Sequence, residues 1–224
     1  MFFVGAGTNL VWLDPSHDLV VVVRWLEGRA VDRFLGRVVQ ALTPERKEAA
    51  SPLPRVVLDT DLGEVELEVD LARAPVTAAN FLRYVDGGFY DGGRFHRTVT
   101  RDNQPDDTVR IEVVQAGIDP ARRGDGFAPI ELERTSVTGL AHVDGTVSMA
   151  RAAPDSARSD FFVCIGDQPA LDFGGARNPD GQGFAAFGRV VRGMDVVRRI
   201  QTAPSEAQQL VPPVAIRRAS RRGS

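Results

Sequence analysis

The amino-acid sequence predicts a mainly β protein, a closed barrel or sandwich of short strands with a smaller unit in front of it. From Arg55 onward, short apolar or alternating runs follow one another with turn residues between them, which is typical of all-β folds. Only two segments of that region have the spacing of apolar residues that a helix needs. Residues 43–54 (TPERKEAASPLP) are polar, charged and proline-bearing, which is the composition of a linker.

Residues 1–42 are predicted to form a hairpin followed by a helix. Leu10–Leu13 and Leu19–Trp25 are strand-like and flank the turn sequence DPSHD. Ala30–Leu42 carries its apolar residues on one helical stripe. The run LVVVVRW is apolar on both faces, which suits a central strand of a larger sheet better than a lone hairpin.

The region after the linker is predicted to begin with a second hairpin. Arg55–Thr60 and Glu64–Asp70 flank the turn sequence DLG, and the second strand alternates valine or leucine with glutamate, as a strand buried on one face does. Helices are predicted at Thr77–Val85, where Pro75 lies near the start, and at Met194–Gln201. The further predicted strands are Phe95–Thr100, Arg110–Ala116, Gly145–Arg151, Asp160–Ile165, Phe184–Val191 and Val214–Ala219.

Composition argues against several classes of protein. The 224 residues, 43% of them hydrophobic, suffice for one core of roughly 150–170 residues and an appendage. The net charge of −3 argues against the basic face of a nucleic-acid-binding protein. Cys164 lies in an apolar run and is expected to be a buried thiol, and the three histidines are too scattered for a metal site. We therefore expect no metal, no cofactor and no nucleic-acid partner.

The sequence shows no targeting signal from which the cellular compartment could be predicted. No apolar run is long enough to span a membrane, so no membrane association is expected. The first residues, MFFVG, have no basic n-region and no cleavage site of a secretion signal. The localisation is thus left open, with the cytoplasm as the default expectation and the periplasm as the alternative, and the chain is expected to be a monomer.

The FHR triplet that ends at Arg97 is the strongest candidate site. Because side chains alternate along a strand, Phe95, Arg97 and Val99 are expected to share one face, as are Val113 and Gln115 on the next strand. An arginine and a glutamine would then project together from an apolar floor, where a guanidinium costs free energy unless it has a partner or a task. Two interpretations stand here: an arginine that bonds a carboxylate at a strand end, or a functional arginine.

Residues 1–42 resemble the extreme C-terminus of serine hydrolases of the class C β-lactamase and penicillin-binding-protein type. The resemblance rests on GAGTNLVWLDPSHDLVVVVRW followed by a helix. The sequences S-x-x-K, Y-x-N and K-T-G or H-T-G that carry the chemistry of those enzymes are absent, which rules out a serine hydrolase. We interpret residues 1–42 as a non-catalytic remnant, 43–54 as a linker and 55–219 as the functional domain.

The functional domain resembles a cyclophilin-type peptidyl-prolyl cis-trans isomerase over residues 55–203. The motifs, in chain order, are VVLDTDLGEVELEV, APVTAANFLRYVDGGFYDG, FHR, VVQAG, GTVSMAR, SDFFVCIGDQPALDF and GFAAFGRVVRGMDVVRRI. The resemblance implies a closed eight-stranded antiparallel barrel with two capping helices. It also implies catalysis of rotation about X-Pro bonds, with proline-containing polypeptides as partners and a role in protein folding.

The resemblance assigns roles to individual residues. Arg97 matches the catalytic arginine, and Gln115 the glutamine that bonds the substrate backbone. Phe162 and Leu171 match walls of the proline pocket, and the backbone of Ala150 matches a position that pairs with the peptide. The remaining positions expected to contact substrate are Val113, Arg151 and Phe184.

Several positions depart from the family pattern. Glu112 and Val113 stand where Phe-Met is common, Ala170 where an aromatic residue is frequent, and Phe184 where His or Tyr is frequent. Arg151 replaces a usual Asn, and the polar span TRDNQPDDTVRI is longer than usual. These changes leave an alternative open: a catalytically weak barrel that grips proline-containing segments as a chaperone or scaffold.

Overall fold

The computed structural model describes residues 2–5, 9–14, 19–24, 53–104 and 109–223. The chain divides into two compact units, Met1–Pro52 and Leu53–Ser224, each described here by itself. The predicted helix at Ala30–Leu42 and nearly all of the predicted linker lie outside the described residues. No helix among the described residues is long and apolar enough to cross a membrane.

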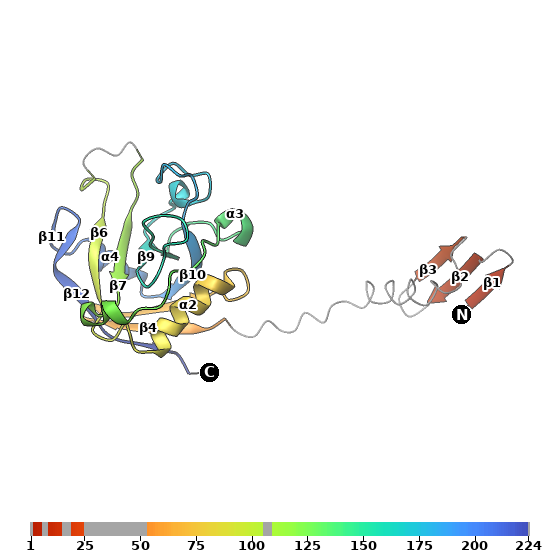
Figure 1. Cartoon of the computed structure of the whole chain (residues 1–224), viewed down its shortest axis with the longest axis horizontal. Helices are drawn as coiled ribbons and strands as arrows, with labels where there is room; N and C mark the ends of the chain where they lie inside the picture. Colours follow the sequence, from red (N-terminus) through yellow and green to blue (C-terminus); the bar gives the residue numbers. More distant parts are fainter. Residues whose placement is uncertain (1, 6–8, 15–18, 25–52, 105–108, 224) are drawn as a thin grey trace. The chain divides into compact units, whose positions relative to one another are not determined.

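The first unit contains a three-stranded antiparallel sheet, one strand more than the predicted hairpin (Figure 1). Its strands are β1 (Phe2–Gly5), β2 (Asn9–Asp14) and β3 (Leu19–Val23), in that order across the sheet. The prediction of only two strands was therefore wrong. The apolar run at the start of the chain forms β1, which pairs with β2 from Phe2 opposite Trp12 to Gly5 opposite Asn9.

The second unit is a closed antiparallel barrel, as predicted (Figure 1). The strand order is β11-β12-β4-β5-β10-β8-β9-β7-β6, and β12 also pairs with β6, so that the eight strands other than the two-residue β11 form a ring. Such closure leaves no sheet edge unpaired. The strands are β4 (Arg55–Thr60), β5 (Gly63–Val69), β6 (Arg94–Val99), β7 (Val113–Gly117), β8 (Thr146–Met149), β9 (Phe161–Cys164), β10 (Ala185–Arg192), β11 (Ser205–Glu206) and β12 (Gln209–Arg221).

Two strands begin three or more residues away from their predicted start, each for a local reason. β7 starts at Val113 instead of 110, because the backbone of Ile111 bonds the side-chain amide of Gln104 (2.9 and 3.2 Å) and not a neighbouring strand. β12 starts at Gln209 instead of 214. Its two prolines, which lack an N–H, lie between the paired positions Gln209 and Val214, where the register with β6 shifts.

The helices match the two predicted ones and add short turns. They are α2 (Pro75–Asp86), α3 (Thr135–Thr138) and α4 (Met194–Gln201), with 3-10 turns at Pro120–Asp125 and Pro169–Leu171. From α2, Phe81 enters the barrel core and meets the rings of Tyr90, Phe161 and Phe187 at centroid distances of 5.4, 5.4 and 5.0 Å. This aromatic cluster fixes the interior against which the strands of the site are packed.

A bulge in β6 changes which side chains share a face. Phe95 lies opposite Ala116 and Arg97 opposite Gln115, so His96 is an extra residue in the strand. Phe95 is buried in the barrel interior, whereas Val99 belongs to a second cluster on the outer face. The prediction that Phe95 shares a face with Arg97 was therefore wrong. The alternation of a regular strand does not hold across an extra residue.

The second apolar cluster covers the outer face of β6, β7 and β9. Its buried members are Val99, Ile111, Val113, Phe162, Cys164 and Leu171. Cys164 is fully buried, as expected, and burial raises the pKa of its thiol.

Beneath this cluster, His142 is buried and stacks on Phe162 at a centroid distance of 6.0 Å. Its Nδ1 lies 2.7 Å from Asp172 and its Nε2 lies 3.0 Å from the hydroxyl of Ser148. Because a carboxylate only accepts, Nδ1–H donates to Asp172 and Nε2 accepts from Ser148.

Burial lowers the pKa of His142, although Asp172 opposes the shift, and burial also lowers the pKa of His96. The unfolded chain then binds more protons than the folded chain below the ordinary histidine pKa of about 6.5. We predict that the free energy of unfolding is at its full value above this pH and falls as the pH drops through the lowered folded pKa values.

Urea titrations followed by circular dichroism, from about pH 7.5 down to pH 5, test this. His142→Gln, which does not titrate in that range, should show a smaller loss of stability with falling pH than the parent. The same slope in both proteins would contradict the assignment of the effect to His142.

Candidate active site

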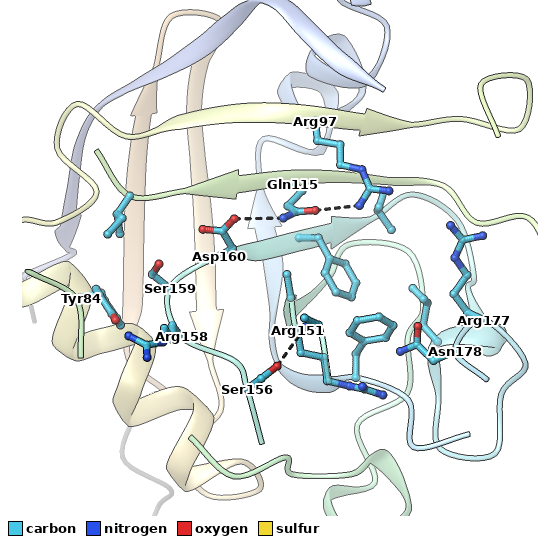
Figure 2. A pocket seen from close by; sticks show the side chains of 18 of the residues that line it. Tyr84, Arg97, Gln115, Arg151, Ser156, Arg158, Ser159, Asp160, Arg177 and Asn178 are labelled. Carbon is cyan, nitrogen blue, oxygen red and sulfur yellow. Dashed lines mark hydrogen bonds between the residues drawn. The ribbon is translucent and has the colours of Figure 1, made fainter. Parts of the chain in front are cut away.

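An open pocket of about 640 Å³ lies over the outer cluster, and all eight predicted site residues line it. They come from β6, β7 and β9, the two residues after β8, the 3-10 turn that ends at Leu171, and the residue directly before β10 (Figure 2). The barrel thus brings to one place residues that are spread from position 97 to position 184. The predicted residues are Arg97, Val113, Gln115, Ala150, Arg151, Phe162, Leu171 and Phe184.

Arg97 is held by two glutamine side chains. Its Nη1 donates to Oε1 of Gln115 at 3.2 Å, and its Nε and Nη2 both donate to Oε1 of Gln208 at 2.9 and 2.5 Å. These bonds use three of the five N–H groups of a guanidinium, and within the described part of the chain two are left over. Burial and the charge of Arg177 lower the pKa of Arg97, but an arginine stays protonated in a protein. Among the described residues, the hydrogen-bonding partners of Arg97 are amides and not carboxylates. The interpretation of Arg97 as an arginine that bonds a carboxylate therefore does not fit.

Gln115 also forms a hydrogen bond to a carboxylate. Its Nε2 donates to Oδ2 of Asp160 at 3.2 Å (Figure 2). The same oxygen lies 3.7 Å from Nε2 of His96, the extra residue of the β6 bulge. The amide of Gln115 is therefore oriented from both ends, with its oxygen toward Arg97.

The wall beside Arg97 is apolar and nearly dry. Val113, Phe162 and Leu171 are each less than 5% exposed. Phe184 packs its ring edge-on against Phe162 at 5.3 Å and an interplanar angle of 89°. A small apolar ring could lie on this wall within reach of a charged donor.

Two of the predicted contact residues already have partners. The N–H of Ala150 donates to the carbonyl of Asp160 at 2.8 Å, which leaves its carbonyl for a peptide. Arg151 makes a bidentate pair with Asp180 (2.8 and 2.9 Å) and donates to the carbonyl of Gly183 at 2.7 Å, and its side chain is only 1% exposed. Its guanidinium carbon lies 5.1 Å from the ring centre of Phe184. Arg151 therefore supports the pocket wall.

Gln208 is the residue that sequence reasoning missed. It lies in the two-residue turn between β11 and β12, and its Nε2 donates to the carbonyl of Asn103 at 3.2 Å. The backbone carbonyl of Gln208 accepts from the N–H of Thr98 at 2.9 Å, which ties the turn to β6. A lone glutamine in a turn 111 positions from Arg97 carries no motif that could have revealed it.

The positions that depart from the family pattern differ in whether their side chains line the pocket. Glu112 pairs with Arg101 at 3.1 Å and is not among the residues that line the pocket. Ala170 packs against the outer cluster, and Phe184 closes one side of the wall. The pocket thus keeps an aromatic wall from Phe184, although Ala170 is small.

Known proteins resemble this chain along almost the whole barrel. The family model for cyclophilin type peptidyl-prolyl cis-trans isomerases matches residues 55–221. Peptidyl-prolyl cis-trans isomerase A of Dickeya dadantii is 35% identical over 159 residues, which cover 70% of this chain and 76% of that protein. A peptidyl-prolyl cis-trans isomerase of Streptomyces antibioticus is 37% identical over 168 residues, 72% of this chain and 94% of that protein.

Solved structures agree on the fold. The crystal structure of a cyclophilin type peptidyl-prolyl cis-trans isomerase from Cryptosporidium parvum superposes with a TM-score of 0.61 at 20% identity, covering 76% of this chain and 98% of that one. The same protein in the presence of the dipeptide Ala-Pro gives a TM-score of 0.60. With the family model spanning the whole barrel, the conclusion is that this chain belongs to the cyclophilin-type peptidyl-prolyl cis-trans isomerases.

Proposed function

We infer that the barrel accelerates rotation about X-Pro peptide bonds in exposed polypeptide segments, and that Arg97 carries the catalysis. The observation that supports this most strongly is a charged guanidinium held by two neutral amides beside an apolar wall. The activity is that of the family, and the assignment of residues to roles is our proposal.

Catalysis of rotation about an X-Pro bond needs a hydrogen-bond donor that interacts with the twisted amide and not with the planar one. Rotation breaks amide resonance, a barrier of about 18–20 kcal/mol. As the bond twists, the prolyl nitrogen becomes pyramidal and gains a lone pair that the planar amide does not offer. An N–H of Arg97 aimed at that lone pair binds the transition state better than the ground state, which is the condition for a faster reaction.

The magnitude shows that Arg97 cannot act alone. A hydrogen bond from a charged group contributes about 1.5–3 kcal/mol net, which at about 1.36 kcal/mol per factor of ten gives one to two powers of ten in rate. We assign the rest to the apolar wall of Val113, Phe162, Leu171 and Phe184, which holds the proline ring and disfavours the more polar planar amide.

Other groups hold the peptide while one side of the bond turns. Gln115 bonds the substrate backbone, and the carbonyl of Ala150 accepts from a peptide N–H, since the N–H of Ala150 is already used. Arg151 keeps Phe184 in place through its pair with Asp180. Gln208 positions Arg97 from the side away from Gln115.

The alternative is a weak catalyst that only grips proline-containing segments. Ala170, in place of a larger side chain, is the feature that supports it, because it packs against the outer cluster and a smaller residue there supports the apolar wall less firmly. Glu112 gives it little support, because its carboxylate bonds Arg101 outside the pocket. We also propose a monomer, and we propose that it has no nucleic-acid partner on the basis of the net charge of −3.

We predict that Arg97→Ala lowers kcat/KM on an Ala-Pro peptide by about ten- to a hundredfold, because it removes the charged donor. A protease-coupled isomerisation assay measures the rate, and an NMR titration measures binding of the same peptide, which should be largely retained. Arg217→Ala, which removes an exposed arginine paired with Asp61, is the matched control. A wild-type rate no faster than the uncatalysed one would leave the binding module as the better description.

We further propose that residues 1–42 are a non-catalytic remnant of a serine-hydrolase-like domain, that 43–54 are a linker and that 55–219 act independently. The proposal is supported by the separate compact unit at Met1–Pro52 with its small antiparallel sheet, and by the missing hydrolase motifs.

We predict that a chain lacking residues 1–50 keeps the melting temperature of the barrel and its kcat/KM. The barrel buries its own core and closes its own sheet, so it does not depend on the first unit for either. Calorimetry and the isomerisation assay on the shortened chain measure both quantities. Collapse of the barrel or loss of activity would disprove the independence of the two units.

A further inference from the structure

The lining of the pocket is strongly basic although the chain is not. Among the residues that the structure describes, five arginines and one carboxylate, Asp160, line it, whereas the whole chain has a net charge of −3. Arg97, Arg123, Arg151, Arg158 and Arg177 are the arginines. An apolar proline ring gives no reason for this charge.

Three of the five are accounted for without any further ligand. Arg97 serves the reaction, and Arg151 is paired with Asp180 under Phe184. Arg177, which lies on the opposite side of Figure 2 from Arg158, donates to the carbonyl of Val109 at 2.9 Å. Arg123 and Arg158 then require a separate explanation.

Arg158 lies in the half of the pocket that holds Tyr84, Ser156 and Ser159 (Figure 2). Arg123 also lines the pocket, and its turn, Pro120–Asp125, is followed by Phe127, whose N–H donates to the hydroxyl of Tyr84 at 2.8 Å. Both arginines are exposed, and neither has an ion pair with a carboxylate among the described residues. Arg158 only donates to the carbonyl of Phe127, at 3.3 Å. Their charges are available to a molecule that occupies the pocket.

Both arginines come from segments that are firmly held. The carbonyl of Arg158 accepts from Asn80 of α2 at 2.6 Å, and the next carbonyl, of Ser159, accepts from the hydroxyl of Tyr90 at 2.6 Å. Arg123 lies in the 3-10 turn Pro120–Asp125, whose start is capped by Asp119. The two side chains therefore project from fixed backbone, and only the side chains need ordering when an anion binds.

We propose that the enzyme prefers X-Pro segments with an aspartate or glutamate close to the proline. This acidic residue lies on the side of the proline that faces Arg123 and Arg158. The proposal rests on the function inferred above and names its substrate class. With the ring on Phe162 and Leu171, an extended peptide runs along the pocket past Asp160, and a side chain one to three residues from the proline reaches these arginines. A carboxylate fits because it accepts a bidentate pair of N–H groups from arginine.

The expected effect is moderate and sensitive to salt. Ion pairs at a solvent-exposed rim are weak, so two of them should raise affinity and kcat/KM by about three- to tenfold over a neutral side chain. Screening at high ionic strength should remove most of that gain. A basic residue at the same position should be disfavoured by a similar factor.

The test uses the full chain and matched peptides that contain one Ala-Pro bond. Glu, Gln or Lys is placed in turn at each of the three positions before Ala and after Pro. Exchange NMR measures isomerisation without a coupling protease, and titration calorimetry measures binding, both at low and at high salt. We expect one flank, and only one, to show the order Glu above Gln above Lys at low salt.

The variants assign the preference to residues. Arg123→Gln with Arg158→Gln should abolish it, so that the Glu and Gln peptides are isomerised at equal rates, and Arg123→Glu with Arg158→Glu should reverse it toward Lys. The control is Arg198→Gln with Arg217→Gln, which removes the same charge from exposed sites off the pocket and should keep the preference.

Equal rates on Glu, Gln and Lys peptides at every position would overturn the proposal and leave the isomerase function intact. A preference that survives the double Gln variant would overturn it too, since the charge of these residues would not be its source. If no peptide were isomerised, the inferred function would fall, and the affinities alone would decide: tighter binding of the Glu peptide, lost in the double Gln variant, supports the proposal, and equal affinities overturn it.

Discussion

The site depends on a guanidinium whose hydrogen-bonding partners are neutral. Gln115 and Gln208 fix the plane of Arg97 with three bonds, yet neither cancels its charge. A carboxylate in place of either glutamine would hold Arg97 as firmly, but it would neutralise the positive charge in an internal ion pair. Because amide oxygens hold the arginine beside an apolar wall, we propose that its charge is left for a substrate atom that becomes a better acceptor during the reaction.

This arrangement exists because the barrel closes. Gln208 precedes β12, and β12 pairs with β4 on one side and with β6 on the other, which brings the turn at 207–208 beside Arg97. On β6 itself, the extra residue His96 allows Phe95 to fill the interior while Arg97 faces the pocket opposite Gln115. Closure and bulge together bring Arg97 and the two glutamines that hold it beside the apolar wall of the pocket.

The sequence allowed much of this to be predicted, and the failures have physical causes. Strand runs and turn residues were enough to predict a barrel or sandwich, and the family motifs were enough to select the closed barrel and to assign Arg97, Gln115, Phe162 and Leu171 to one site. Period-two alternation cannot reveal a bulge, so Phe95 was assigned to the wrong face. Arg151 lines the pocket, and its contact with substrate stays a prediction, but its pair with Asp180, from a loop 29 positions away, has no signal in the sequence. Gln208 belongs to a short turn without periodicity, and only the closure of the sheet gives it a role.

The substitution Gln208→Glu tests the role of the neutral amide most directly. It keeps the size of the side chain and the acceptor that Arg97 needs, and adds the charge that the account says must be absent. The difference between a charged and a neutral hydrogen bond is about 1–1.5 kcal/mol, so we predict that kcat/KM falls by about tenfold while the melting temperature is unchanged or higher. An unchanged or increased kcat/KM in this variant would contradict the claim that Arg97 works because its partners leave its charge free.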